Sequence, residues 1–145
     1  MGDIFKKILI ATDGSENARN AVFYGLELAK MAGAEVYTLY VISDEHASTA
    51  RKVMGWTESI EKYLADRGEI ATASVEKIGK EAGVKVESVF SKGSPAEEIL
   101  DYAGKNGIDL VVMGTQGLTG IKKFLIGSVA ENVLRHSNIP VMVVR

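Results

Sequence analysis

Five short apolar runs, separated by stretches with helical periodicity, restrict the fold of this chain more than any other feature. The runs cover residues 7–12, 35–42, 84–90, 109–113 and 140–144. The first and fourth are typical of strands buried on both faces, and the third partly alternates, as an edge strand does. Alternating strands and helices favour an α/β fold, so we expect one domain over residues 1–145, with an open parallel five-stranded sheet and helices on both faces.

The helical stretches carry start and stop signals. Ser15 is a good N-cap with Gly33 as the stop, and a long helix is predicted from Thr57 to Gly83. Ser-x-x-Glu capping boxes predict helices over residues 94–105 and 128–135, and the polar segment 43–56 predicts a surface loop or a frayed helix start. The buried face predicted for the long helix consists of Ile60, Leu64, Arg67, Ala71, Val75, Ile78 and Ala82.

A glycine pattern lies between the fourth strand and the last helix. Gly114 and Gly117 are followed by nine residues and then by Gly127-Ser128. Glycine can adopt positive φ and lets the backbone come close to a ligand, and the helix N-terminus offers unpaired N–H groups to an anion. The spacing matches neither a Walker A loop nor the dinucleotide fingerprint. The pattern predicts a phosphate site of another type, with a loop that only turns the chain as the alternative.

The carboxyl ends of the strands are the expected place for a ligand. Open α/β sheets bind ligands where the strand order reverses, and a common order for five strands is 3-2-1-4-5. The first strand then ends at Thr12-Asp13, next to the fourth, which ends at Met113-Gly114. Val41 ends the second strand, close enough to line the same crevice.

The sequence resembles the universal stress protein family from about Phe5 to Arg145. The resemblance rests on residues 7–15 (KILIATDGS), 39–41 (LYV), 93–95 (GSP) and 109–114 (DLVVMG), and on the G-x2-G-x9-G-S pattern from Gly114 to Ser128. Family members with this glycine pattern bind ATP. The resemblance therefore implies a Rossmann-like, adenine-nucleotide alpha hydrolase-like fold, ATP or another adenine nucleotide with Mg²⁺ as ligand, and a cytoplasmic protein of the stress response.

By matching position, the resemblance implies a role for each residue of the crevice. Asp13 would contact the ribose or a phosphate-bound Mg²⁺, and Val41 would meet adenine through its backbone. Ala11 stands where many members have proline, which slightly changes that wall. The other residues implied to line the nucleotide or hold its phosphates are Thr12, Met113, Gly114, Thr115, Gln116, Gly117, Gly127, Ser128, Val129 and Ala130.

Structural explanations stay open for several of these residues. Asp13 could serve only to cap the first helix beside Ser15, and Ser128 could be only the N-cap of the last helix, with Glu131 reciprocating. Lys122 and Lys123 could neutralise phosphates or be solvated surface groups.

Composition argues against several functional classes. The chain has 145 residues, a formal net charge of -2 and no cysteine. We therefore expect no attraction to nucleic acid or acidic membranes, and no disulfide or thiolate site. No apolar run reaches the roughly 18 residues of a membrane span, and the N-terminus lacks the form of a signal peptide.

Three functions fit these observations. The first is a regulatory homodimer that uses an adenine nucleotide to change conformation or the choice of an unidentified protein partner. The second is a slow ATPase or phosphotransferase, although no catalytic base is evident. The third is a dimerisation scaffold that the nucleotide only stabilises. Residues 140–144 form an apolar edge strand before the terminal Arg145, and pairing with its own copy is expected, as in universal stress proteins.

Overall fold

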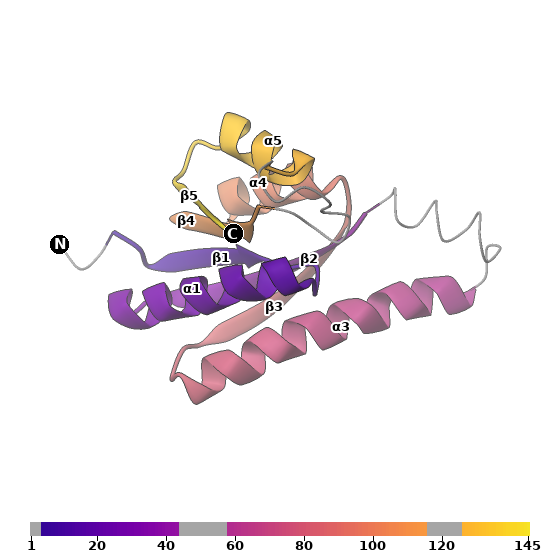
Figure 1. The fold of residues 1–145 in the computed structure, drawn as a ribbon, viewed down its shortest axis with the longest axis horizontal. Helices are drawn as coiled ribbons and strands as arrows, with labels where there is room; N and C mark the ends of the chain where they lie inside the picture. The colour runs from indigo at the N-terminus through magenta and orange to yellow at the C-terminus, as the bar shows by residue number, and fades with distance from the viewer. Residues whose placement is uncertain (1–3, 44–57, 116–125) are drawn as a thin grey trace.

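The apolar runs form one sheet of five parallel strands in the order β3-β2-β1-β4-β5 (Figure 1). This computed structural model describes residues 4–43, 58–115 and 126–145. The strands are β1 (Lys7–Ala11), β2 (Glu35–Ser43), β3 (Val86–Gly93), β4 (Leu110–Gly114) and β5 (Val141–Val144). The predicted α/β class, the strand order and the edge position of β3 are confirmed.

Helices cover both faces of the sheet, as expected. They are α1 (Glu16–Ala32), α3 (Glu58–Glu81), α4 (Pro95–Lys105) and α5 (Ser128–His136). Alternation along β1 sends Ile8 and Ile10 into a core with α1 and α3, and Leu9 into a second core with α4 and α5. Figure 1 shows the two pairs of helices on opposite sides of the strands. None of the described helices is long and apolar enough to cross a membrane.

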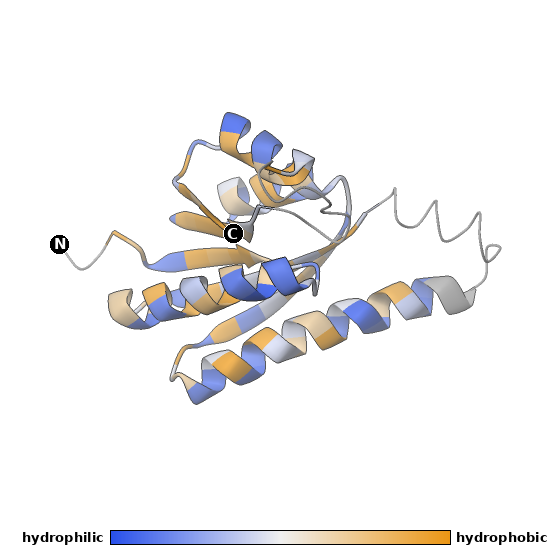
Figure 2. Cartoon of the chain, viewed as in Figure 1, coloured by the Kyte–Doolittle hydropathy of each residue, from blue (hydrophilic) through white to orange (hydrophobic). Residues whose placement is uncertain are grey.

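The α3 helix packs on the sheet through small residues, so its predicted buried face is partly wrong. Gly68, Thr72, Val75 and Gly79 are buried, whereas Arg67 and Ile78 from the predicted face are exposed. A Cβ on Gly68 would lie 2.8 Å from Cδ1 of Tyr40, and one on Gly79 would collide with the side chain of Val86. Glycine therefore permits the close approach of α3 to β2 and β3. Figure 2 shows hydrophobic and hydrophilic residues alternating along the visible surface of this helix.

The helix starts confirm one predicted cap and correct two. The Ser15 hydroxyl accepts a hydrogen bond from the Ala18 N–H at 3.2 Å, as predicted. Ser94 occupies the cap position of α4 with Pro95 following, but its side chain makes no capping bond. Ser128 is not a cap.

The α5 helix begins one residue earlier than the capping-box interpretation requires. Gly127 is its N-cap, and Ser128 is already its first helical residue. Glu131 does not reach back to the cap; its carboxylate pairs with Arg135 at 2.8 Å on the exposed side of the helix. The N-terminus of α5 therefore has no side-chain cap.

Candidate functional site

A tight turn follows β1 and fixes Thr12 and Asp13 at the carboxyl edge of the sheet. Thr12 Oγ1 accepts from the Gly14 N–H at 3.2 Å, and Asp13 Oδ1 accepts from the Ser15 N–H at 2.9 Å. Gly14 has φ of 79°, a left-handed conformation that favours glycine. Asp13 therefore stabilises the turn that leads into α1. This agrees with the structural role considered above, in which Asp13 caps the first helix. Its Oδ2 has no hydrogen bond within the described part of the chain, so a ligand role stays compatible.

The end of β2 extends past the end of β1 and reaches the same crevice. The Leu39 carbonyl accepts from the Thr12 N–H at 3.0 Å, and Leu39 is in register with Ala11 at the end of β1. Alternate residues of a parallel strand direct their N–H and C=O groups to the same side. The backbone of Val41 therefore points toward the side on which β1 has already ended. This is the position from which a backbone can contact a base.

The first turn of α1 packs against Gly114, at the end of β4. A Cβ at this position would collide with Asn17 Oδ1 and lie 3.0 Å from Asn17 Cγ. Neither Gly114 nor Gly127 has positive φ, so a left-handed conformation is not the reason for glycine at these two positions. Glycine at 114 allows a close approach between β4 and α1, and direct pairing of β1 with β4 places the ends of the two strands side by side.

The two ends of the glycine segment meet at Thr115. Its carbonyl oxygen accepts from the Gly127 N–H at 2.6 Å, and its own N–H donates to the Val144 carbonyl at 3.0 Å. The predicted residues Gln116 and Gly117 lie outside the described residues, as do Lys122 and Lys123. The uncapped N-terminus of α5 therefore lies beside the end of β4.

The first turn of α5 presents backbone N–H groups at this corner. The N–H groups at the start of a helix have no intrahelical partner, and α5 has no side-chain cap. Ser128 is exposed, Val129 half-buried and Ala130 buried. The structure thus places the predicted donors together. Met113 was also predicted to line the nucleotide, but its side chain is buried in the α4–α5 core.

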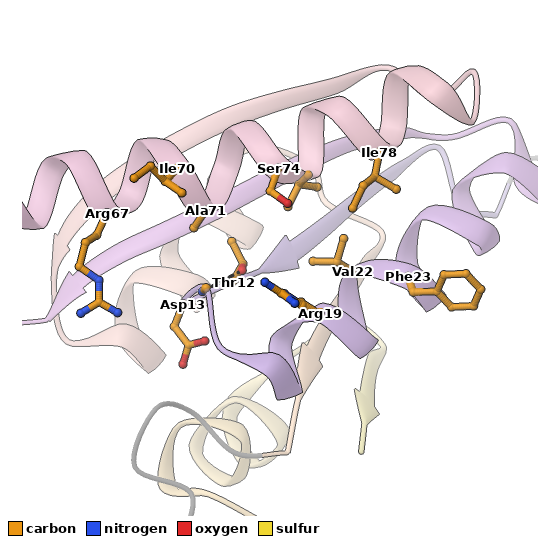
Figure 3. Close-up of a pocket in the computed structure, with 12 residues that line it drawn as sticks. Thr12, Asp13, Arg19, Val22, Phe23, Arg67, Ile70, Ala71, Ser74 and Ile78 are labelled. Atoms are coloured by element: carbon orange, nitrogen blue, oxygen red, sulfur yellow. Dashed lines mark hydrogen bonds between the residues drawn. The ribbon is translucent and has the colours of Figure 1, made fainter.

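A cavity of about 510 Å³ adjoins the crevice between α1 and α3 (Figure 3). Its lining includes Thr12, Asp13 and Gly14 together with Arg19 and Arg67. Neither this cavity nor the contact of Asn17 with Gly114 was predicted from the sequence. The available signal was weak: a polar residue in the first turn of a helix and an arginine within an otherwise apolar helical stripe.

The pKa of the Tyr40 hydroxyl responds to charged groups of the crevice and the cavity. Burial raises the pKa of its hydroxyl above the ordinary value of 10.0. The positive charge of Arg67 lowers this pKa, whereas the negative charge of Asp13 and ionisation of the Tyr63 hydroxyl raise it. No cluster of three or more metal-ligating side chains occurs among the described residues. Any metal at Asp13 would take further ligands from water or from a bound phosphate.

Comparisons with known proteins show which sequences and folds this chain is similar to. The sequence matches the model of the universal stress protein family over residues 4–145. The universal stress protein MJ0531 of Methanocaldococcus jannaschii is 40% identical over 143 residues, covering 99% of this chain and 84% of the relative.

Solved structures show the same fold. That of MJ0577 from the same organism has a TM-score of 0.80 at 33% identity and covers 97% of this chain and 96% of its own. A universal stress protein in complex with cAMP has a TM-score of 0.71 at 23% identity and covers 97% of each chain. With a family match along almost its entire length, this protein belongs to the universal stress protein family.

Proposed function

We propose that the protein binds an adenine nucleotide, ATP with Mg²⁺, at the carboxyl ends of β1, β2 and β4, and that the nucleotide regulates a cytoplasmic homodimer of the stress response. The observation that carries this proposal is the uncapped N-terminus of α5, held against the end of β4 by the Gly127–Thr115 hydrogen bond. N–H groups that have no intrahelical partner, together with the helix dipole, suit phosphate oxygens.

The other side of the crevice suits the nucleoside. The Val41 backbone offers a donor and an acceptor beyond the end of β1, which matches the polar edge of a base. Asp13 adds a carboxylate, which fits either ribose hydroxyls or Mg²⁺. Mg²⁺ binds oxygen ligands, keeps several waters and is often held by one or two carboxylates and substrate phosphates, so one protein carboxylate is compatible with it.

The comparisons support the ligand class without fixing it for this chain. The cAMP-bound universal stress protein shares its fold, and its ligand is an adenine nucleotide. At 23% identity this likeness concerns the fold, and ATP enters here because the glycine pattern resembles that of family members that bind ATP.

The position of α5 supports the proposed regulation of the homodimer by the nucleotide. This helix begins at the proposed phosphate site and leads directly into β5, the free edge strand at the opposite side of the sheet from β3. A ligand that holds the N-terminus of α5 can therefore favour one arrangement of β5, and by linkage dimerisation would alter nucleotide affinity by the same factor.

Titration calorimetry with ATP, with and without Mg²⁺, tests the proposal. We expect binding with Mg²⁺, and we expect Asp13→Asn to weaken the effect of the metal, while the exposed Asp101→Asn on α4 serves as a matched control. Absence of heat and of a thermal shift at millimolar ATP would contradict the proposal. Nucleotide released on denaturing the purified protein would identify the ligand.

The same samples distinguish regulation from catalysis. A regulatory protein leaves ATP intact after long incubation. Accumulation of ADP that is abolished by Asp13→Asn would instead support the ATPase, because phosphoryl transfer depends on metal and on positioned charge.

A further inference from the structure

The cavity between α1 and α3 has an apolar lining that extends from the α1–α3 core to exposed side chains. Val22 and Val75 are buried at its base, whereas Phe23, Ile70 and Ile78 are 58%, 71% and 42% exposed along its length. The two helices run side by side here, with Arg67 and Ile78 of α3 and Arg19 and Val22 of α1 facing the gap (Figure 3). The volume of about 510 Å³ lies within the range of small-molecule sites, roughly 300–1,000 Å³.

Part of the helical stripe that was expected to pack on the sheet lies along this cavity, and Val75 belongs both to the stripe and to the α1–α3 core. Arg67, Ala71, Val75 and Ile78 belong to that stripe, and all four line the cavity. Close packing through Gly68 and Gly79 turns the stripe from the sheet toward α1. Exposed apolar side chains are ordinary when scattered singly. Here several are collected on one concave surface.

Two positive charges are set into this surface. Arg19 and Arg67 are exposed, and neither forms a salt bridge within residues 4–43, 58–115 and 126–145. The Arg67 guanidinium lies 5.8 Å from the ring centroid of Tyr63. Asp13 is the only carboxylate among the described residues of the lining, and the charges of these residues sum to +1. An occupant must therefore combine an apolar body with a negative charge.

We propose that this cavity binds a single medium-chain fatty acid in its carboxylate form. Its alkyl chain lies along Phe23, Ile70 and Ile78, and its carboxylate interacts with Arg19 and Arg67, whose two positive charges outweigh the single negative charge of the neighbouring Asp13. A guanidinium matches the two oxygens of a carboxylate in a bidentate geometry. The proposal does not depend on nucleotide binding, although both sites share Thr12, Asp13 and Gly14 at their boundary.

Calorimetry with octanoate, decanoate and dodecanoate below micelle-forming concentrations tests the proposal. We expect the affinity to rise up to about fourfold for each methylene that becomes buried. Arg19→Gln with Arg67→Gln should weaken dodecanoate binding by at least about tenfold. Lys30→Gln with Lys80→Gln removes the same charge from α1 and α3 outside the cavity and should leave binding unchanged. Equal affinity for dodecyltrimethylammonium, or binding unaffected by the double arginine variant, would overturn the proposal.

A second pair of variants tests the apolar wall without endangering the fold. Ile70→Ser should weaken binding, whereas Met31→Ser on α1, 83% exposed and outside the cavity, should not. If Ile70→Ser instead dissociates a dimer in light scattering, a second copy of the chain occupies this surface and the proposal fails. Gly117→Val should retain dodecanoate binding, so loss of nucleotide binding and loss of carboxylate binding can be told apart.

Discussion

The Gly127 N–H donates to the Thr115 carbonyl at 2.6 Å and closes the glycine segment at its base. Thr115 also donates its own N–H to Val144, the last residue of β5. One residue therefore joins the end of β4, the start of α5 and the free edge strand. A ligand at the α5 N-terminus and a partner at β5 would act on the same corner of the molecule.

Gly117→Val should abolish ATP binding while leaving the fold intact. Gly117 lies outside the described residues, and the prediction rests on its place in the glycine pattern, where a side chain would block close backbone approach. Calorimetry gives the affinity, and thermal unfolding shows whether the variant folds. Gly104→Val is the control, because nothing lies within 4 Å of a Cβ at Gly104. Normal ATP binding by Gly117→Val would move the phosphate site away from this segment.

Ser128→Ala should reduce ATP affinity by about two- to twelvefold, corresponding to roughly 0.5–1.5 kcal/mol for one hydrogen bond. The free energy of unfolding should stay within about 0.5 kcal/mol, as for surface substitutions away from special features, because Ser128 is exposed and Gly127 occupies the N-cap. Chemical denaturation measures the stability. A loss near 1 kcal/mol with unchanged ATP affinity would assign Ser128 a structural role instead.

The fold was predictable because its signals are local. Hydrophobic runs such as residues 109–113 and the stop signal at Gly33 act within a few residues, and they sufficed for the element types and order. The cap of α5 was misassigned by one residue because Ser-x-x-Glu identifies a composition, whereas the backbone dihedral angles of Gly127 and Ser128 decide which residue caps.

The features of the structure that could not be predicted from the sequence depend on contacts between segments that are distant in the chain. The family resemblance implies that Gly114 lines the nucleotide, but Gly114 also gives space to Asn17 of α1. The long-helix stripe was assigned to the core because apolar spacing does not reveal that Gly68 and Gly79 pack more closely on the sheet. Glycine carries no hydropathy signal strong enough to mark a buried helix face.

Gly79→Ala should destabilise the protein by about 1–2 kcal/mol. Its Cβ would collide with the stiff side chain of Val86 and lie 3.2 Å from the Val84 carbonyl oxygen, and overpacking of about 1–3 kcal/mol exceeds a helix-propensity gain of up to about 1 kcal/mol. Gly104→Ala in α4 lacks the collision and should stabilise by about 0.5–1 kcal/mol. Denaturant midpoints measure both, and a stabilised Gly79→Ala would show that α3 does not need this close contact.

The free edge of β5 should form a homodimer by antiparallel pairing with its own copy. Val111 N–H donates to the Pro140 carbonyl and Thr115 N–H to the Val144 carbonyl, so the even-numbered residues of β5 face β4. The backbone groups of Val141 and Val143 therefore point to the open edge, which invites another strand. Light scattering at micromolar concentration measures the assembly, and a stable wild-type monomer would contradict the prediction.

Two variants of Val143 separate the interface from the core. Val143→Asp should give a monomer or aggregate, but this side chain also packs on the α4–α5 core, so folding suffers too. Val143→Pro removes only an outward N–H and preserves the bonds to β4. We expect a folded monomer, whereas Lys92→Pro, at an outward position of the β3 edge, should remain dimeric. If charges at both Val141 and Val143 leave the dimer intact, the interface lies elsewhere.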